Sequence, residues 1–225
     1  MNAQPTTKLV IVAKNTMLVE SLSIWLGHQP GLTLLGRAEA DADGLDVCRL
    51  NRPDMVLVDV TPPQFAGLDL VESLRRDLPT VRVVVMSDQT DPYTIWRISR
   101  CKVPGFVEKS SQLTMLMEAI TAVAGGANSY STRYRKTENE WLTRPDAFHK
   151  ILTKRERQIL LRVVAGWDDP AIGNELGISV HTVAVHRKNI RAKLRLRNDR
   201  ALIAYANTWG FGSATNPTIL RPAFA

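Results

Sequence analysis

The sequence predicts an α/β fold, a doubly wound five-stranded parallel sheet, followed by an all-α helix-turn-helix domain. Between residues 9 and 123, five short apolar runs alternate with five segments of helical periodicity, as in a parallel sheet with crossover helices. From residue 152 onward only helical patterns occur, separated by Gly, Pro and capping residues. At 225 residues the chain is long enough for two such domains.

The five apolar runs are expected to be the strands of this sheet, and the runs at 9–13 and 55–60 are expected to be buried strands. They comprise residues 9–13, 32–38, 55–60, 81–86 and 105–108. Helical spacing predicts helices over residues 17–26, 45–50, 68–76, 93–100 and 112–123. Polar site residues gather at the carboxyl ends of strands in such folds, and the ends of the third, fourth and fifth runs carry Asp59, Ser87 and Lys109.

Two short helices separated by a tight turn are predicted in the second half of the chain. The first starts at Asp168 or Asp169, has Pro170 in its first turn, and is closed by Gly177. The second starts after Ser179, which is a strong helix N-cap. Further helices are predicted over residues 154–166 and 200–207.

The helix after Ser179 has one face suited to packing and one basic face. Its apolar stripe comprises Val183, Ile190 and Leu194. The opposite stripe comprises His181, Val185, Lys188, Ala192 and Arg195. Residues 179–200 contain seven Lys or Arg and one acid, a pattern that suits a helix lying in the major groove of DNA.

The charge of the chain is divided unevenly between its halves. Residues 1–124 carry 12 Lys and Arg against 14 Asp and Glu, a net charge of −2. Residues 125–225 carry 17 against 8, a net charge of +9. A near-neutral first half and a basic second half indicate a regulatory domain followed by a domain that binds a polyanion.

Other compositional signals exclude several classes of protein. Cys48 and Cys101 have neither disulfide nor metal-ligand spacing, and no triad, metal cluster or phosphate loop indicates an enzyme. The chain has no apolar run of about 20 residues and no signal peptide. We therefore expect a cytoplasmic protein with no membrane partner.

The helical segments carry the motifs of a known family. The stretches LTKRERQILLRVVAG, AIGNELGIS and HTVAVHRKNIRAKL resemble the C-terminal DNA-binding domain of LuxR/NarL-type transcription regulators. Two positions depart from the family. Ala184 stands where Lys is frequent, which removes a DNA contact. Gly173 stands where Ala is usual, which weakens its helix by up to about 1 kcal/mol.

The resemblance and the exposed helix face together suggest residue roles. Lys188 matches a base-contacting lysine and is expected to read guanine O6 and N7, while Val185 is expected to contact a thymine methyl. The candidates for phosphate contacts are Thr182, Arg187 and Arg191. His181 is expected to contact a base or a phosphate, and His186 is expected to pack. The full set of candidate DNA-binding residues is Ser179, His181, Thr182, Val185, Arg187, Lys188, Arg191 and Lys193.

The first half carries a second resemblance, to the receiver domain of bacterial response regulators. Its motifs are DMVLVDV, Pro63, Gly67, VVVMS and GFVEK. The resemblance implies that Asp59 accepts a phosphoryl group from a histidine kinase and that Ser87 bonds a phosphoryl oxygen. It also implies that Lys109 pairs with this group and that Phe106 is the aromatic switch. A carboxylate nucleophile, a hydroxyl and a cation then converge on one oxyanion.

The receiver resemblance fails at the metal site. Receivers usually end the first strand with two acids that hold a divalent cation, and here those positions are Ala13 and Lys14. Mg²⁺ prefers oxygen ligands and usually needs carboxylates, and phosphoryl transfer relies on that cation to neutralise developing charge. We therefore expect Mg²⁺ binding to be weak or absent, and we expect no other cofactor. We hypothesise an atypical receiver that works without ordinary phosphorylation, in which Lys14 pairs with Asp59. Either the site residues are relics in a domain kept for dimerisation, or a ligand, a partner or a constitutive fold replaces phosphate.

The predicted organisation is a receiver-like domain over 7–124, a linker over 125–147, the helix-turn-helix domain over 148–211 and a tail over 212–225. The linker aromatics Tyr130, Tyr134 and Trp141 either pack on a neighbouring domain or are incidental in a mobile segment.

The expected function is a sequence-specific transcription regulator of a two-component system that binds double-stranded DNA as a homodimer. One alternative is an auxiliary co-regulator that acts mainly by heterodimerisation with another regulator. A second is an ordinary response regulator that a histidine kinase phosphorylates at Asp59.

Overall fold

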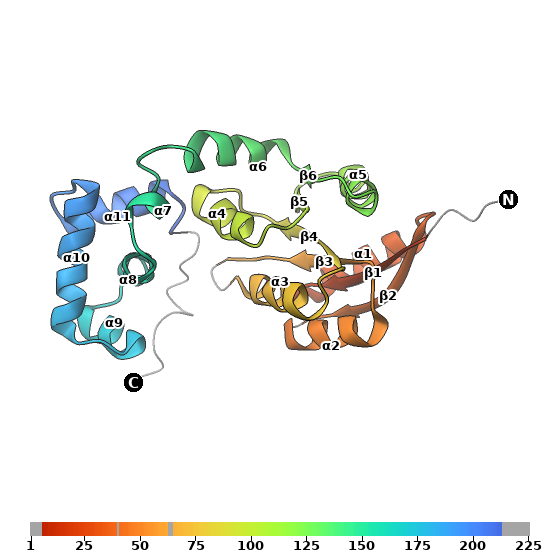
Figure 1. Cartoon of the computed structure of the whole chain (residues 1–225), viewed down its shortest axis with the longest axis horizontal. Helices are drawn as coiled ribbons and strands as arrows, with labels where there is room; N and C mark the ends of the chain where they lie inside the picture. The colour runs from red at the N-terminus through yellow and green to blue at the C-terminus, as the bar shows by residue number, and fades with distance from the viewer. Residues whose placement is uncertain (1–5, 40, 63–64, 213–225) are drawn as a thin grey trace. The chain divides into compact units, whose positions relative to one another are not determined.

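The structure is a computed structural model that describes residues 6–39, 41–62 and 65–212. Its contacts divide the chain into two compact units. The first comprises Met1–Thr90 with Arg97–Lys136, and the second comprises Asp91–Trp96 with Thr137–Ala225. Figure 1 labels the elements of both.

The first unit is built on a parallel sheet with the strand order β2-β1-β3-β4-β5-β6. The strands are β1 (Thr7–Val12), β2 (Leu32–Ala38), β3 (Met55–Asp59), β4 (Arg82–Ser87), β5 (Gly105–Glu108) and β6 (Ser129–Tyr130). The first five confirm the predicted strands, and β6 adds a sixth. The order reverses between β1 and β3, which places the topological switch point beside the carboxyl end of β3.

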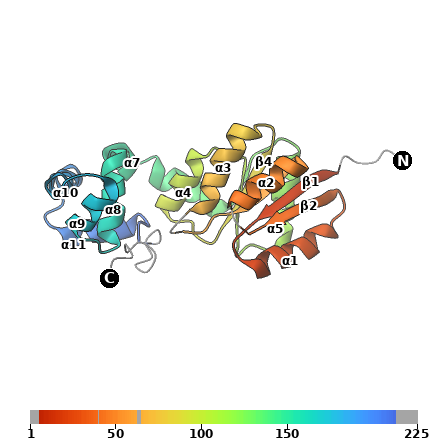
Figure 2. The same ribbon diagram turned by 90° about the horizontal axis from the view of Figure 1, so that it is seen from below.

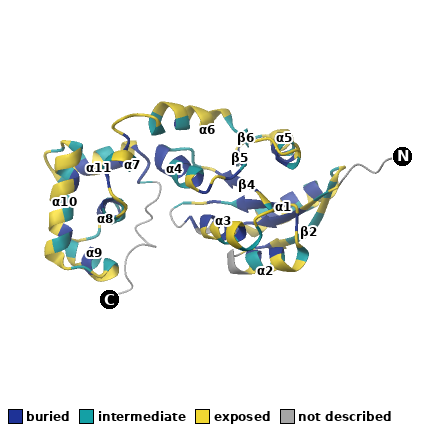
Figure 3. Cartoon of the chain, viewed as in Figure 1, coloured by how far each residue is buried: buried dark blue, intermediate teal, exposed yellow. Residues whose placement is uncertain are grey.

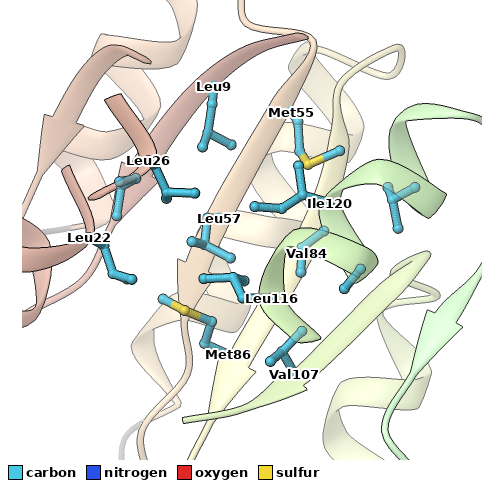
Figure 4. Close-up of a cluster of buried hydrophobic side chains, with 13 residues drawn as sticks. Leu9, Leu22, Leu26, Met55, Leu57, Val84, Met86, Val107, Leu116 and Ile120 are labelled. Atoms are coloured by element: carbon cyan, nitrogen blue, oxygen red, sulfur yellow. The ribbon is translucent and has the colours of Figure 1, made fainter. Parts of the chain in front are cut away.

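Helices cover both faces of this sheet. They are α1 (Thr16–Gly27), α2 (Asp41–Asn51), α3 (Ala66–Asp77) and α5 (Leu113–Ala124). Helix α4 (Pro92–Arg100) follows β4, and its residues Pro92–Trp96 belong to the second unit. In Figure 2, α1 and α5 lie on one face, and α2 and α3 lie on the other. Apolar side chains of α1, α5 and the strands form one buried cluster, drawn in Figure 4. Figure 3 shows the central strands buried, as their continuous apolar sequence predicts.

The segment predicted as a linker, residues 125–147, contains regular structure. The segment forms β6, helix α6 (Thr132–Thr137) and a π-helical turn over Glu138–Leu142. Aromatic packing holds β6 and α6 in place. The Tyr130 hydroxyl donates to the Val103 carbonyl at 2.8 Å, and Tyr130 stacks on Tyr134. Tyr134, which is buried, packs on Phe106 with ring centroids 5.0 Å apart. Both tyrosines thus belong to the receiver-like unit.

The second unit is helical in its described part. Its helices are α7 (Phe148–Ile151), α8 (Lys154–Val164), α9 (Asp169–Leu176), α10 (Val180–Leu194) and α11 (Asp199–Thr208). The predicted N-caps are confirmed, because Asp168 accepts from the Ala171 amide and Ser179 accepts from the Thr182 amide. Phe211 is buried, whereas the predicted tail lies outside the described residues except for Gly212. The single-turn helix α7 was not predicted.

A close backbone approach explains the glycine that departs from the family pattern in α9. A Cβ atom at Gly173 would lie 2.7 Å from the Ile178 carbonyl oxygen in the turn before α10. Gly177 closes α9 in the left-handed conformation, with φ at +65°. The missing side chain therefore lets the turn fold tightly against α9 and sets where α10 begins.

We predict that Gly173→Ala destabilises the second unit, although alanine gains about 1 kcal/mol of helix propensity. The backbone oxygen has little freedom to retreat, so we expect a net loss of about 1–3 kcal/mol in the free energy of unfolding. Chemical denaturation followed by circular dichroism measures it. Gly27→Ala is the matched control, because a Cβ there meets nothing within 4 Å. A Gly173→Ala protein that is more stable than wild type would contradict the close approach.

Glu156 ties the start of α8 to the end of α10. It forms a capping box with Thr153: its amide donates to the Thr153 hydroxyl, and its carboxylate accepts from the Thr153 amide at 2.8 Å. The same carboxylate accepts from Lys193 Nζ at 2.8 Å. Burial opposes ionisation of Glu156, but these bonds outweigh it and lower its pKa. The charged form therefore stabilises the fold.

We predict that Glu156→Gln lowers the free energy of unfolding at pH 7 by about 1–2 kcal/mol, since it removes a charge-assisted bond. Because the folded pKa is depressed, this stabilisation is present above the unfolded pKa and is lost as pH falls through the folded value. The difference in free energy of unfolding between wild type and variant should therefore become smaller at acidic pH. Thermal unfolding across a pH series tests this. Glu175→Gln, which breaks the exposed pair with Arg162, should lower the free energy of unfolding by less than Glu156→Gln does. Equal stability of wild type and Glu156→Gln at pH 7 would refute the prediction.

Candidate functional site

Three predicted site residues meet at the carboxyl edge of the parallel sheet. In the strand register, Asp59 of β3 lies beside Met86 of β4, and Ser87 lies beside Glu108 of β5. Backbone bonds from Val60 to Met86 and from Lys109 to Ser87, of 2.8 and 2.9 Å, continue this pairing beyond the strands. The chain thereby brings together Asp59, Ser87 and Lys109, as expected.

Asp59 is held by a cation and a hydroxyl. Lys109 Nζ lies 2.6 Å from Asp59 Oδ1, and the Asp59 side chain is only 4% exposed. Thr61 Oγ1 donates to Asp59 Oδ1 at 3.2 Å and accepts from Lys109 Nζ at 2.9 Å. Thr61 was not among the predicted site residues; its signal is a hydroxyl two positions after the strand-end carboxylate. The three side chains form a closed polar cluster.

Ser87 and Phe106 are both buried. The Ser87 hydroxyl donates to the Val60 carbonyl at 2.7 Å and accepts from the Gln89 amide at 3.3 Å. It therefore bonds to backbone on either side of the β3–β4 edge. Phe106 packs on Tyr134, so the residue matched to the aromatic switch contacts the segment that follows β6.

The residues at the end of β1 do not fit a Mg²⁺ site. Ala13 is buried and has no side-chain ligand atom, and the exposed Lys14 brings a cation where a receiver has an acid. The Asn15 side chain accepts from the Leu18 amide as the N-cap of α1. Asp59, the one carboxylate of the set, is ion-paired with Lys109. Among the described residues no group of three His, Cys, Asp or Glu is placed to hold a metal ion. The pairing of Lys14 with Asp59 stays a prediction.

The basic face of α10 is exposed as predicted. Its exposed residues include His181, Val185, Lys188, Ala192 and Arg195. On the opposite side Val183 and Ile190 are fully buried, and Leu194 is half-buried. Val185, at 42% exposure, is a large apolar side chain on a polar face. Such a face offers apolar and cationic contacts together, which suits the edges of base pairs.

Three of the candidate DNA contacts are ion-paired within the unit. Arg187 pairs with Asp169 at the start of α9 and with Asp199 at the start of α11. Arg191 pairs with the same Asp199 at 2.5 Å, and Lys193 pairs with Glu156 at 2.8 Å. Partial burial opposes ionisation of Asp199, but hydrogen bonds from Arg191 and Arg187 and the charge of Arg187 lower its pKa.

The remaining candidates are differently placed. The Ser179 hydroxyl caps α10 and lies 2.8 Å from the Thr182 hydroxyl. Lys188 is exposed, and within the part of the chain that the structure describes it has no hydrogen-bond or ion-pair partner. His186, expected to pack, is half-buried. The acids that hold the arginines, Asp169 and Asp199, were not predicted as part of the site because each looks like an ordinary first-turn helix residue.

None of the helices in the described ranges has the length and apolar character required to cross a bilayer.

Comparisons with known proteins match both units. Residues 150–206 match the family described as bacterial regulatory proteins, luxR family, and residues 9–121 match the response regulator receiver domain. The chain is 29% identical over 214 residues to the transcriptional regulatory protein MctR of Rhizobium johnstonii, covering 95% of this chain and 99% of that protein. It is 22% identical over 199 residues to the response regulator protein VraR of Staphylococcus saprophyticus, covering 88% and 95%.

Solved structures share the same fold. RcsB from Salmonella enterica serovar Typhimurium, bound to the promoter rprA in the presence of the phosphomimetic BeF3⁻, has a TM-score of 0.64 and 18% identity. That match covers 90% of this chain and 98% of the other. A second solved structure holds two RcsB dimers bound to two parallel DNAs, with a TM-score of 0.61. The chain is thus a regulator and not an enzyme: it belongs to the response regulators, with a receiver domain followed by a DNA-binding domain of the LuxR family.

Proposed function

We propose that this response regulator is a sequence-specific transcription regulator that reads DNA through the exposed face of α10. The observation that carries the proposal is the exposure of Lys188 and Val185 on one face, while Val183 and Ile190 anchor the other face in the core. An amino group at Lys188 suits guanine O6 and N7, and Val185 suits a thymine methyl. RcsB dimers bound to DNA support binding as a homodimer.

Lys188→Ala should weaken binding to a cognate duplex by about 1–3 kcal/mol and relax the preference at the guanine position that Lys188 contacts. Binding to an unrelated duplex should change much less. The ratio of the two dissociation constants, measured at one fixed salt concentration, tests this. Lys154→Ala is the matched control, because Lys154 is an exposed lysine on α8 rather than α10. An equal loss on both duplexes would show that Lys188 contacts only phosphate.

We further propose that the receiver works without ordinary Mg²⁺-dependent phosphorylation at Asp59. One observation supports this: Ala13 and Lys14 supply no carboxylate at the end of β1. A divalent cation normally neutralises the charge that develops during phosphoryl transfer, and the acid pair that holds it is absent from these positions. A ligand, a partner protein or a constitutive fold then takes the place of the phosphoryl group.

We expect no mass increase when the full-length protein is incubated with Mg²⁺ and a small phosphodonor under conditions that modify an ordinary receiver. Intact-protein mass spectrometry measures this directly, with Asp59→Ala as the control for the site. An increase of one phosphate that disappears in Asp59→Ala would refute the proposal. It would favour an ordinary phosphorylated response regulator, with a histidine kinase as its partner.

A co-regulator that acts mainly through heterodimerisation is the second candidate. The exposed Ala184 favours it, because the family often has a lysine at this position of the recognition helix and alanine supplies no hydrogen bond to DNA. Sequence-specific binding by the purified protein alone separates the two candidates.

A further inference from the structure

We propose that Asp199, with Asp169, withholds Arg187 and Arg191 from DNA phosphates and so limits sequence-independent DNA binding. The inference rests on the proposed function, in which α10 lies against DNA. It assigns Asp199 as a positioning residue that determines how strongly the domain prefers its cognate sequence over other DNA.

The fold places Asp199 where both arginines reach it. Asn198 caps α11 through a 2.9 Å bond to the Ala201 amide, which fixes Asp199 in the first helical turn. Arg187 and Arg191 lie one turn apart on α10 and project from the same side of that helix. One carboxylate oxygen of Asp199 bonds to each guanidinium. A single residue thereby joins two recognition-helix cations.

The two arginines differ in how firmly they are held. Arg187 also pairs with Asp169 of α9, and its side chain is 18% exposed. In the described part of the chain Arg191 pairs with Asp199 alone, and its side chain is 29% exposed. Charge-assisted bonds in a partly buried site are stronger than those at an open surface, so moving a guanidinium to a DNA phosphate requires breaking one. Arg191 is the cation that loss of the Asp199 charge would release.

The consequence concerns DNA of any sequence. Each phosphate that a cation neutralises releases counterions. A plot of the logarithm of the binding constant against the logarithm of the salt concentration then has a slope of about −0.9 per contact. Cations already neutralised by Asp199, Asp169 and Glu156 do not contribute to that slope. Lys188, Arg195 and Arg197, by contrast, have no ion-pair partner within the described ranges. Non-specific affinity is therefore lower than the count of basic residues suggests, while base contacts are kept.

If Asp199 had only a structural role, its replacement would have the opposite effect on DNA binding. If Asp199 only fastens α10 to α11, its loss loosens the recognition helix and weakens binding to every duplex. If Asp199 withholds Arg191, its neutralisation strengthens binding to unrelated DNA and steepens the salt dependence. The salt slope therefore separates the two roles.

The test measures binding of the full-length protein to a duplex of unrelated sequence over a series of salt concentrations. For Asp199→Asn we expect tighter binding, by about fivefold at 0.15 M salt, and a slope steeper by about 0.9. Asp199→Glu should keep the wild-type slope. Glu175→Gln is the matched control, because it removes one negative charge and breaks one ion pair, with Arg162, without touching α10.

A double-mutant cycle with Arg191→Gln isolates the released cation. Arg191→Gln should leave the slope unchanged in the wild-type background and should cancel the extra slope in the Asp199→Asn background. If the salt dependence of the single Arg191→Gln variant is shallower than that of the wild type by about 0.9, the inference is overturned even if Asp199→Asn does not fold. An unchanged slope in folded Asp199→Asn would also overturn it. A wild-type protein that binds no duplex would instead overturn the proposed function and, with it, this inference.

Discussion

Parallel pairing of the apolar strands is the constraint on which the receiver site depends. Because β3, β4 and β5 run in the same direction and lie side by side, their carboxyl ends meet at one edge. Asp59, Ser87 and Lys109 then converge without any local sequence contact between them. The burial of these strands between two layers of helices fixes their register, so the edge is positioned by the core rather than by its own polar bonds.

The two functional regions share one electrostatic feature. In each, charges that the sequence offers to an external partner are already matched by opposite charges of the chain. Asp59 is paired with Lys109, and Arg187 with Asp169 and Asp199. Any ligand must therefore compete with an existing ion pair, and its binding depends on the difference between two electrostatic interactions.

Local patterns predicted most of the fold. Apolar runs gave the first five strands, and capping residues such as Asp168 and Ser179 gave the starts of α9 and α10 correctly. The sixth strand escaped prediction because two residues carry no periodicity. It forms because Tyr130 donates to the Val103 carbonyl and Tyr134 packs on Phe106, which are contacts between residues distant in the sequence.

The sequence by itself determined the two-part architecture, the exposed face of α10 and the absence of the acid pair at Ala13 and Lys14. These depend on residue type and on helical or strand periodicity, which are local properties. Tertiary structure decided which charges are available, since Arg187 and Lys188 are adjacent in sequence yet only Arg187 meets carboxylates from α9 and α11. Whether a cation is paired depends on residues brought together by folding, which no local pattern in the chain encodes.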